Sequence, residues 1–157
     1  MIWAGIVHRT IIGQFKVDEG IKLNSVRYCA FLEKTFLQWY KAQPRSFKTK
    51  CTFMHDNAPS HASRLTKQFL EGKRIKGDRI MEWPASSPDL NPIENVWSIL
   101  KRKLYEGGKQ YRNKLDLWEA IKSIFAEVAP EEIDNLTNSM DDRLVKVIEG
   151  KGRYINM

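Results

Sequence analysis

Hydrophobic and polar positions in the first part of the chain follow the pattern of a β-hairpin. In "MIWAGIVHRTIIGQFKV", two short apolar runs flank a polar break at His8-Arg9-Thr10. Two β-prone runs joined by a short polar stretch are typical of paired antiparallel strands. The turn-forming residues "DEG" at 18–20 then close the segment. We therefore expect strands over about 2–7 and 11–17.

The next segment has the pattern of an amphipathic helix over about 24–42. Asn24 or Ser25 is a suitable N-cap, and Pro44 lies just past the expected end. The apolar positions recur at intervals of three and four, which places them on one helix face. These positions are Val26, Cys29, Leu32, Phe36, Trp39 and Tyr40.

The middle of the chain combines short β-prone runs with helix and loop signals. "KCTFMH" (50–55) and "RIMEW" (79–83) are predicted strands. Between them, "ASRLTKQFLEGK" (62–73) predicts a helix of about ten residues. Gly72 is the expected residue just after its end, because glycine accepts the left-handed conformation that helix ends require. "PASSPDLNP" (84–92) contains three prolines and is a predicted loop.

Helical patterns fill the rest of the chain. Asn91-Pro92-Ile93-Glu94 begins one helix, with a capping asparagine, a proline at the first position and a glutamate at the third. After the linker "YEGGKQYRNK" (105–114), apolar spacing predicts a second helix around Leu115 to Phe125. Pro130 opens a third, which runs to about Glu149 and stops at Gly150. Strands come first and helices last, so the predicted class is mixed α/β.

Composition indicates an ordinary folded domain. The chain has 157 residues, of which 42% are hydrophobic, enough for one domain with a sizeable core. Its two cysteines, Cys29 and Cys51, do not make a disulfide framework and suit core packing in a reducing compartment. No apolar run is long enough to span a bilayer, and the N-terminus is a poor signal peptide. We expect a soluble intracellular protein.

Charge is unevenly distributed along the chain. The formal net charge is +7, and residues 41–80 contain ten Lys or Arg against three acids. This basic excess brackets Asp56, and a cationic surface around an acidic centre suits a polyanion such as nucleic acid. A lysine-rich solvated surface would give the same count. Charge alone therefore leaves both interpretations open.

Two acids, Asp56 and Glu94, are candidate site residues, and each has a structural alternative. Asp56 follows a predicted strand, where a rigid element can aim a carboxylate at a metal. It could instead form an Asx-turn, or cap the helix that follows. Glu94 stands where a capping-box glutamate would. A zinc site with His55 and His61 is disfavoured, because their spacing is irregular and no HExxH pattern occurs.

The motifs around these two acids closely resemble catalytic-domain signatures of the mariner superfamily of DNA transposases. "HDNAPSHAS" holds Asp56 and "WPASSPDLNPIENVW" holds Glu94, with 37 residues between the two acids. "MIWAGI", "LNSVRYCAFLE" and the C-terminal region with its "SM..R...VI..KG" pattern are similar to the same family. The chain therefore resembles, over essentially its whole length, the C-terminal part of a Tc/mariner DDE transposase catalytic domain.

The resemblance implies a ribonuclease H-like α/β fold: a mixed five-stranded sheet flanked by helices, with a helical C-terminal tail. Asp56 matches the family's second catalytic aspartate, at the end of the fourth strand. Glu94 matches the third acid, on the helix after the fifth strand. Both would be catalytic and metal ligands, binding Mg²⁺ or Mn²⁺, two ions by resemblance. Two ions about 4 Å apart can activate the attacking oxygen and stabilise the leaving one, and carboxylates suit such hard cations.

The resemblance also implies partners. DNA would be the substrate, with its phosphates held by basic residues near Asp56. The candidates are Lys48, Lys50, Arg64, Lys67, Lys73 and Arg74. A homodimer and a nuclear location fit the family, whereas a membrane or a small-molecule substrate does not.

The match is incomplete at its start. The family's first aspartate lies on a first strand upstream of the region that "MIWAGI" matches, and this chain begins at that region. Asp18 and Glu19 fall in the turn after the hairpin and are not substitutes. We therefore expect residues 1–157 to form one N-terminally truncated DDE domain, lacking the central first strand and the helix-turn-helix domains. Such a truncated copy or incomplete gene product should bind metal poorly and show no transposition activity.

A second interpretation stays open: a non-catalytic nucleic-acid-binding or interaction module that reuses the transposase scaffold and its basic face. The intact pair Asp56 and Glu94 favours an enzyme by descent. The absent first acid favours the module.

Overall fold

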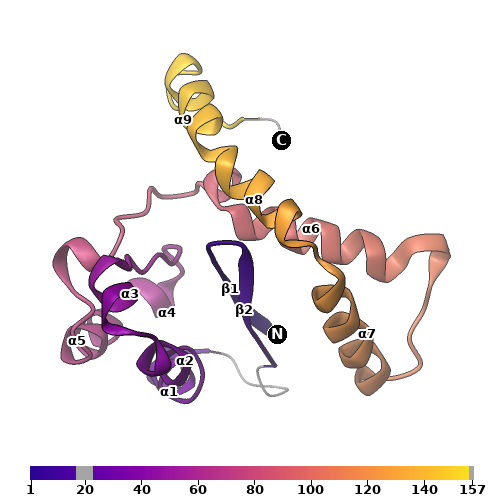
Figure 1. Cartoon of the computed structure of the whole chain (residues 1–157), viewed down its shortest axis with the longest axis horizontal. Helices are drawn as coiled ribbons and strands as arrows, with labels where there is room; N and C mark the ends of the chain where they lie inside the picture. Colours follow the sequence, from indigo (N-terminus) through magenta and orange to yellow (C-terminus); the bar gives the residue numbers. More distant parts are fainter. Residues whose placement is uncertain (17–22, 156–157) are drawn as a thin grey trace. The chain divides into compact units, whose positions relative to one another are not determined.

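The computed structural model describes residues 1–16 and 23–155, and within it the chain divides into two compact units. One unit comprises Met1–Lys16 and Ser87–Met157, and the other comprises Val17–Ser86. Figure 1 follows both along the chain by colour. The turn predicted at 18–20 lies outside the described residues.

The hairpin predicted at the N-terminus is confirmed. Strand β1 (Ile2–Val7) pairs antiparallel with β2 (Thr10–Lys16). Side chains alternate across a strand, so Ile2, Ala4 and Ile6 share one face. That face packs on the core of the first unit. The hairpin therefore forms a small sheet that the helices of this unit cover.

The helices of this unit pack against the hairpin and one another. They are α6 (Pro92–Tyr105), α7 (Lys114–Glu127), α8 (Pro130–Asn138) and α9 (Met140–Glu149), with short 3-10 turns η2 (Pro88–Leu90) and η3 (Glu106–Gly108). Apolar stripes predicted for the helices supply the core, which confirms their helical periodicity. Its buried residues are Val96, Leu100, Leu104, Ile121, Ile124, Phe125 and Ile133.

The single helix predicted over 130–149 is wrong in one respect, because Ser139 separates α8 from α9. The Ser139 hydroxyl donates to the Leu136 carbonyl at 2.8 Å and accepts a hydrogen bond from Arg143 Nε at 3.0 Å. Serine side chains that bond to nearby backbone compete with the helical ladder. The expected end at Gly150 is confirmed.

The second unit is mostly helical. Its elements are α1 (Ser25–Lys34), α2 (Phe36–Ala42), α3 (Arg45–Lys50), α4 (Pro59–Ala62), α5 (Arg64–Gly72) and the 3-10 turn η1 (Gly77–Arg79). Asn24 is the N-cap of α1, as predicted, and its side chain accepts a hydrogen bond from the Arg27 amide at 3.0 Å. The largest buried side chains include Tyr28, Leu32, Leu37 and Leu70.

Two helix predictions in this unit need correction. The helix expected over 24–42 is interrupted at Thr35, whose hydroxyl donates to the Phe31 carbonyl at 2.6 Å. Helix α3 was not predicted, because residues 45–50 carry no apolar periodicity and α3 buries none of its residues. The apolar periodicity of residues 24–42 therefore predicted helical structure there correctly, but it did not predict the break at Thr35.

The strands predicted at 50–55 and 79–83 are wrong in extent. They shrink to one parallel bridge between Phe53 and Ile80. The Phe53 amide donates to the Arg79 carbonyl at 2.7 Å, and the Met81 amide donates to the Phe53 carbonyl at 2.9 Å. Strand formation depends on pairing with neighbouring segments, and among the described residues these two runs pair at this bridge alone. The bridge still fixes where the chain enters the loop that carries Asp56.

The end of α5 also differs from its prediction. Gly72 is the last helical residue, and Arg74 takes the left-handed conformation, with φ of 64°. The Ile75 amide bonds to the Leu70 carbonyl at 3.0 Å and the Arg74 amide to the Glu71 carbonyl at 2.9 Å, which is the Schellman pattern. Burial of Ile75 and Leu70 supplies the hydrophobic contact that selects this geometry.

The cysteine predictions are partly confirmed. Both thiols are free, and Cys29 is buried on α1 as core packing predicts. Cys51 is half-buried and follows α3 instead of lying on a strand. None of the helices in the described ranges combines the length and apolarity needed to cross a membrane.

Candidate functional site

The carboxylate of Asp56 stands in the loop between the Phe53 bridge and α4. Its Oδ1 accepts hydrogen bonds from the Ala58 amide at 3.1 Å and from His61 Nδ1 at 2.5 Å. The Asx-turn considered for this residue is therefore present, but it occupies only one oxygen. The side chain is 55% exposed, and Oδ2 has no partner among the described residues. One oxygen is anchored and the other is open to a ligand.

A group of aromatic rings surrounds the histidine that contacts Asp56. The ring of His61 lies 4.1 Å from the ring of Tyr28 and 5.3 Å from that of His55. Tyr28 is fully buried, and its hydroxyl lies 3.4 Å from His55 Nδ1. Sequence reasoning did not assign His61 to the site. The sequence signal that could have identified His61 is Pro59. This proline starts the single helical turn of α4, and the turn places His61 beside Asp56.

Burial sets the charge of the neighbouring histidine. Desolvation lowers the pKa of His55 to about 4, with repulsion from His61 as the next cause. His55 is therefore neutral near neutral pH. Within the described ranges, no group of three or more His, Cys, Asp or Glu side chains is arranged to hold a metal ion.

The second candidate acid, Glu94, occupies the third position of α6. Asn91 caps this helix, because its Oδ1 accepts a hydrogen bond from the Ile93 amide at 3.3 Å. The capping-box alternative for Glu94 is wrong: the Asn91 amide donates to the Pro88 carbonyl at 2.9 Å instead. Glu94 is half-buried, and its carboxylate has no hydrogen bond or ion pair with any other described residue.

A buried arginine holds the segment that precedes Glu94. Arg143 of α9 donates to the Asp89 carbonyl and to Asn95 Oδ1, both at 3.0 Å. Asp89 is itself buried, and its Oδ2 accepts a hydrogen bond from the Ile155 amide at 3.1 Å. These contacts tie the start of α6 to the C-terminal helix. The tail thereby sets where Glu94 stands within its unit.

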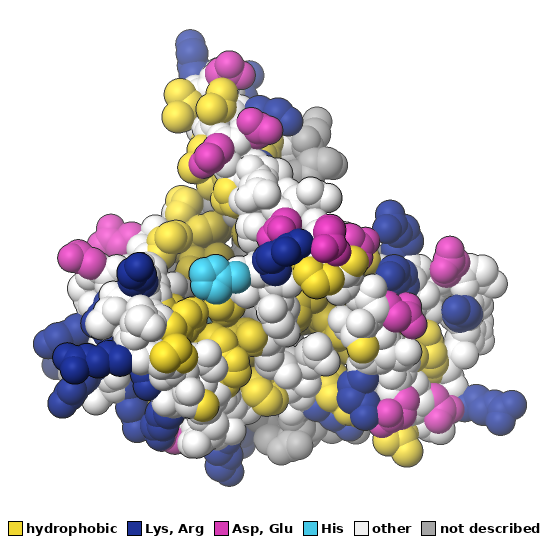
Figure 2. Space-filling view, in the orientation of Figure 1, with side chains coloured by type: hydrophobic (Ala, Val, Ile, Leu, Met, Phe, Trp, Pro, Cys, Tyr) yellow, Lys and Arg dark blue, Asp and Glu magenta, His cyan; other side chains and the backbone are white. Residues whose placement is uncertain are grey.

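The predicted phosphate-binding residues differ in how open they are. Lys48 and Lys73 are half-buried; Lys48 Nζ donates to the Lys41 carbonyl at 2.9 Å, and Lys73 pairs with Glu33. The remaining four are exposed and make no ion pair with any described residue: Lys50, Arg64, Lys67 and Arg74. Figure 2 shows Lys and Arg side chains gathered at the left of the view, over α3 and α5.

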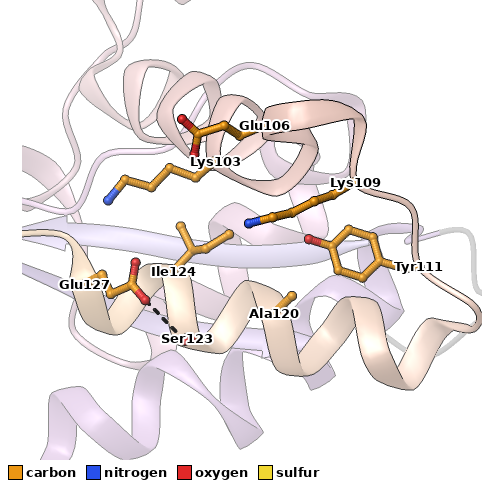
Figure 3. Close-up of a pocket in the computed structure, with 8 residues that line it drawn as sticks. All are labelled: Lys103, Glu106, Lys109, Tyr111, Ala120, Ser123, Ile124 and Glu127. Carbon is orange, nitrogen blue, oxygen red and sulfur yellow. Dashed lines mark hydrogen bonds between the residues drawn. The ribbon is translucent and has the colours of Figure 1, made fainter.

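An open cavity of about 300 Å³ lies between α6, η3 and α7 (Figure 3). Neither Asp56 nor Glu94 lines it. The amines of Lys103 and Lys109 share its wall with two carboxylates, so opposite charges meet there. This cavity is therefore not the site that the sequence motifs indicate.

The two acids belong to different compact units, Asp56 to Val17–Ser86 and Glu94 to the unit that begins again at Ser87. Their chemistry fits the divalent cation that the sequence resemblance implies. Each presents hard carboxylate oxygen, which Mg²⁺ and Mn²⁺ prefer. Each carboxylate also has at least one oxygen atom that makes no ion pair with a described cationic side chain.

Comparison with protein families gives a match that spans both acids. The family model described as "DDE superfamily endonuclease" matches residues 7–117. The transposase of transposable element Tc3 from Caenorhabditis elegans is 35% identical over 135 residues, covering 86% of this chain and 39% of that protein. The Tc1 transposase of Caenorhabditis elegans is 28% identical over 153 residues, covering 97% and 52%. The chain thus spans about half the length of these relatives or less.

Solved structures share the fold. The catalytic domain of Mos1 mariner transposase superposes with a TM-score of 0.82 at 22% identity, covering 98% of this chain and 74% of that chain. A Mos1 mariner paired-end complex with Mn gives 0.82, covering 95% and 43%. The ribonuclease H-like α/β fold predicted from the sequence is therefore confirmed. Of the expected five-stranded sheet, the described residues form the two-stranded β1–β2 sheet and the Phe53–Ile80 bridge.

Proposed function

The chain belongs to the DDE superfamily of endonucleases, and from that premise we propose that it supplies part of a metal-dependent centre for DNA phosphoryl transfer. Its similarity to Tc and mariner transposases supports strand cleavage and integration as the reaction class. Asp56 and Glu94 are the proposed catalytic acids, because both lie in the matched region and in the motifs that resemble this family.

The observation that carries the proposal is that both acids of the family motifs have carboxylates without a Lys or Arg partner among the described residues. Elsewhere in the chain, Glu33 is paired with two lysines and Glu131 with Arg9. Asp56 and Glu94 have no Lys or Arg partner among the described residues. An acid kept clear of basic side chains, in a chain of net charge +7, remains able to bind a cation.

Asp56 and Glu94 would hold Mg²⁺ or Mn²⁺ through their carboxylate oxygens. When bound, such ions supply Lewis-acid stabilisation of the negative charge on the reacting phosphate oxygens. The exposed bases Lys50, Arg64 and Lys67 would contact phosphates of the DNA backbone, which orients the strand without reading its sequence.

Two carboxylates are fewer than a DDE centre uses, so we propose that residues 1–157 alone bind the metal weakly and do not cleave DNA. The family resemblance places the remaining aspartate outside the part that these residues match. The paired-end complexes of Mos1 transposase support DNA as the partner. A homodimer and a nuclear location remain predictions from the family.

The test has two readouts on the same protein. In the ¹⁵N-labelled chain, Mn²⁺ should broaden the amide signals next to Asp56 and next to Glu94, because a bound paramagnetic ion relaxes nearby nuclei. Asp56→Ala should remove the first effect and Glu94→Ala the second. Signals around Asp116, an exposed acid at the start of α7 and outside both motifs, serve as the control and should stay sharp.

The second readout is single-turnover cleavage of a labelled DNA duplex in Mg²⁺ and in Mn²⁺. We expect no cleavage, together with salt-sensitive binding of the duplex that neither substitution changes. Cleavage that both substitutions abolish would contradict the proposed inactivity. Absence of Mn²⁺ effects at both acids, with DNA binding retained, would favour the non-catalytic nucleic-acid-binding module, which the exposed bases of α5 support.

A further inference from the structure

We propose that His61 is a positioning residue for Asp56, holding one carboxylate oxygen so that the other stays directed toward a divalent cation. This inference rests on the proposed function, because it assumes that Asp56 is a metal ligand. It adds a role for a side chain that lies five positions beyond the acid and contacts it directly.

The hydrogen-bond chemistry assigns the direction of this contact. An ionised carboxylate only accepts, so His61 Nδ1 carries a hydrogen and donates a hydrogen bond to Asp56 Oδ1. The Ala58 amide donates to the same oxygen at 3.1 Å. Two donors on one oxygen fix the rotation of the carboxylate, and Oδ2 is left without a partner among the described residues. A ligand oxygen held in this way loses little rotational freedom when it binds a cation.

His61 is itself held on several sides. Only 19% of its side chain is exposed, and its ring lies against the buried ring of Tyr28, 4.1 Å away. The turn that carries it is fixed by Thr66, a fully buried residue whose hydroxyl donates to the Ser60 carbonyl at 2.6 Å. The imidazole therefore transmits the rigidity of the α1–α5 core to the acid.

A purely structural role, in which His61 only closes the loop, makes a different prediction. The Asx-turn through the Ala58 amide already closes that loop without the imidazole. Removing the imidazole N–H should therefore leave the fold in place and free the carboxylate to rotate. The affinity for a cation would fall while the secondary structure stayed unchanged.

The experiment is a Mn²⁺ titration of the ¹⁵N-labelled chain, followed by broadening of the Asn57 and Ala58 amide signals. His61→Phe keeps a ring against Tyr28 but removes the donor, and it should raise the Mn²⁺ concentration at half-effect about tenfold. His61→Asn places an amide N–H near the position of Nδ1 and should return that concentration to within about threefold of the unsubstituted chain.

Two controls keep the result specific. His55→Phe removes a neighbouring imidazole that makes no hydrogen bond to Asp56 and should leave the titration unchanged. Should His61→Phe fail to fold, His61→Ala and His61→Asn form a second pair, because both lose the ring and only asparagine donates. Circular dichroism checks that each variant is folded.

The outcomes separate this inference from the function it rests on. Broadening that Asp56→Ala removes, but that His61→Phe and His61→Ala leave unchanged, would overturn the positioning role and leave the metal role of Asp56 standing. Absence of broadening at Asp56 in the unsubstituted chain would overturn both. Weaker binding in His61→Phe that His61→Asn restores would support both.

Discussion

Carboxylates in this chain fall into paired and unpaired kinds, and Glu33 illustrates the first. Its oxygens lie 2.9 Å from Lys41 Nζ and 2.5 Å from Lys73 Nζ. The hydrogen bond from Lys73 lowers the pKa of Glu33 most, and the hydrogen bond from Lys41 is the next largest cause. Asp56 and Glu94 have no such partners among the described residues, so their charge is left for a ligand. The contrast shows which carboxylates already have a cationic partner, and the family motifs then distinguish Asp56 and Glu94 from other acids that are unpaired among the described residues, such as Glu82.

The pairing of Glu33 predicts an acid-dependent loss of stability. Its folded-state pKa lies below that of the unfolded chain, so the unfolded state binds more protons in acid. The contribution is therefore present above the unfolded pKa and is lost as pH falls through the folded pKa. Glu33→Gln should lower the urea midpoint at pH 7, and the difference from the unsubstituted chain should close in acid. A difference that stays constant down to pH 3 would contradict this assignment.

Packing between elements is concentrated where α9 meets the start of α6. Arg143 is buried, and its guanidinium bonds to the Asp89 carbonyl, Asn95 Oδ1 and Ser139 Oγ, each at 3.0 Å. One side chain thus ties two segments far apart in the sequence. It also explains why the C-terminal region belongs to the same compact unit as Glu94.

Loss of this arginine should destabilise the unit that holds Glu94. Arg143→Met keeps the apolar stem but leaves buried acceptors without a charged donor, and should lower the free energy of unfolding by about 3 kcal/mol. Lys146→Met, at an exposed position of the same helix, should change it by about 0.5 kcal/mol or less. Urea unfolding measures both, and amide hydrogen exchange locates the loss in α9. Equal effects of the two substitutions would rule out the proposed role of Arg143.

Charge over the whole chain is the property most directly linked to DNA. The formal net charge is +7, yet residues 130–149 carry six acids against two bases, and the excess lies in residues 41–80. In the structure, Lys50, Arg64, Lys67 and Arg74 are exposed and unpaired among the described residues. Under the proposed function, DNA phosphates should therefore contact the second unit through α5 and the end of α3.

Binding through phosphates makes a quantitative prediction. Each lost phosphate contact should reduce the slope of log K against log salt by about 0.9 on duplex DNA. Lys67→Ala should show this reduction in fluorescence-anisotropy titrations at several salt concentrations. Lys146→Ala removes the same charge from α9 and should leave the slope unchanged. Equal reductions for both variants would mean that binding depends on total charge and not on the α5 surface.

The local patterns that the sequence predicted correctly have short-range causes. The hairpin over 2–16, the caps at Asn24 and Asn91 and the apolar stripe of α6 all follow from side chains within a few residues of one another. The family and its fold followed from two motifs, because the motifs retain residue types that their chemistry requires. The same motifs are the ground on which Asp56 and Glu94 are proposed as site residues.

Contacts between distant residues and competition among nearby hydrogen-bond partners decided the rest. The runs at 50–55 and 79–83 favour strands, but a ladder depends on its neighbours, and only the Phe53–Ile80 bridge forms. Glu94 satisfies a capping-box pattern, yet the Pro88 carbonyl takes the Asn91 amide. The His61 ring that bonds to Asp56 also packs against the buried ring of Tyr28, about thirty positions earlier. Residue types and spacing select elements and chemistry, whereas burial and competing hydrogen-bond partners select which of the allowed contacts exist.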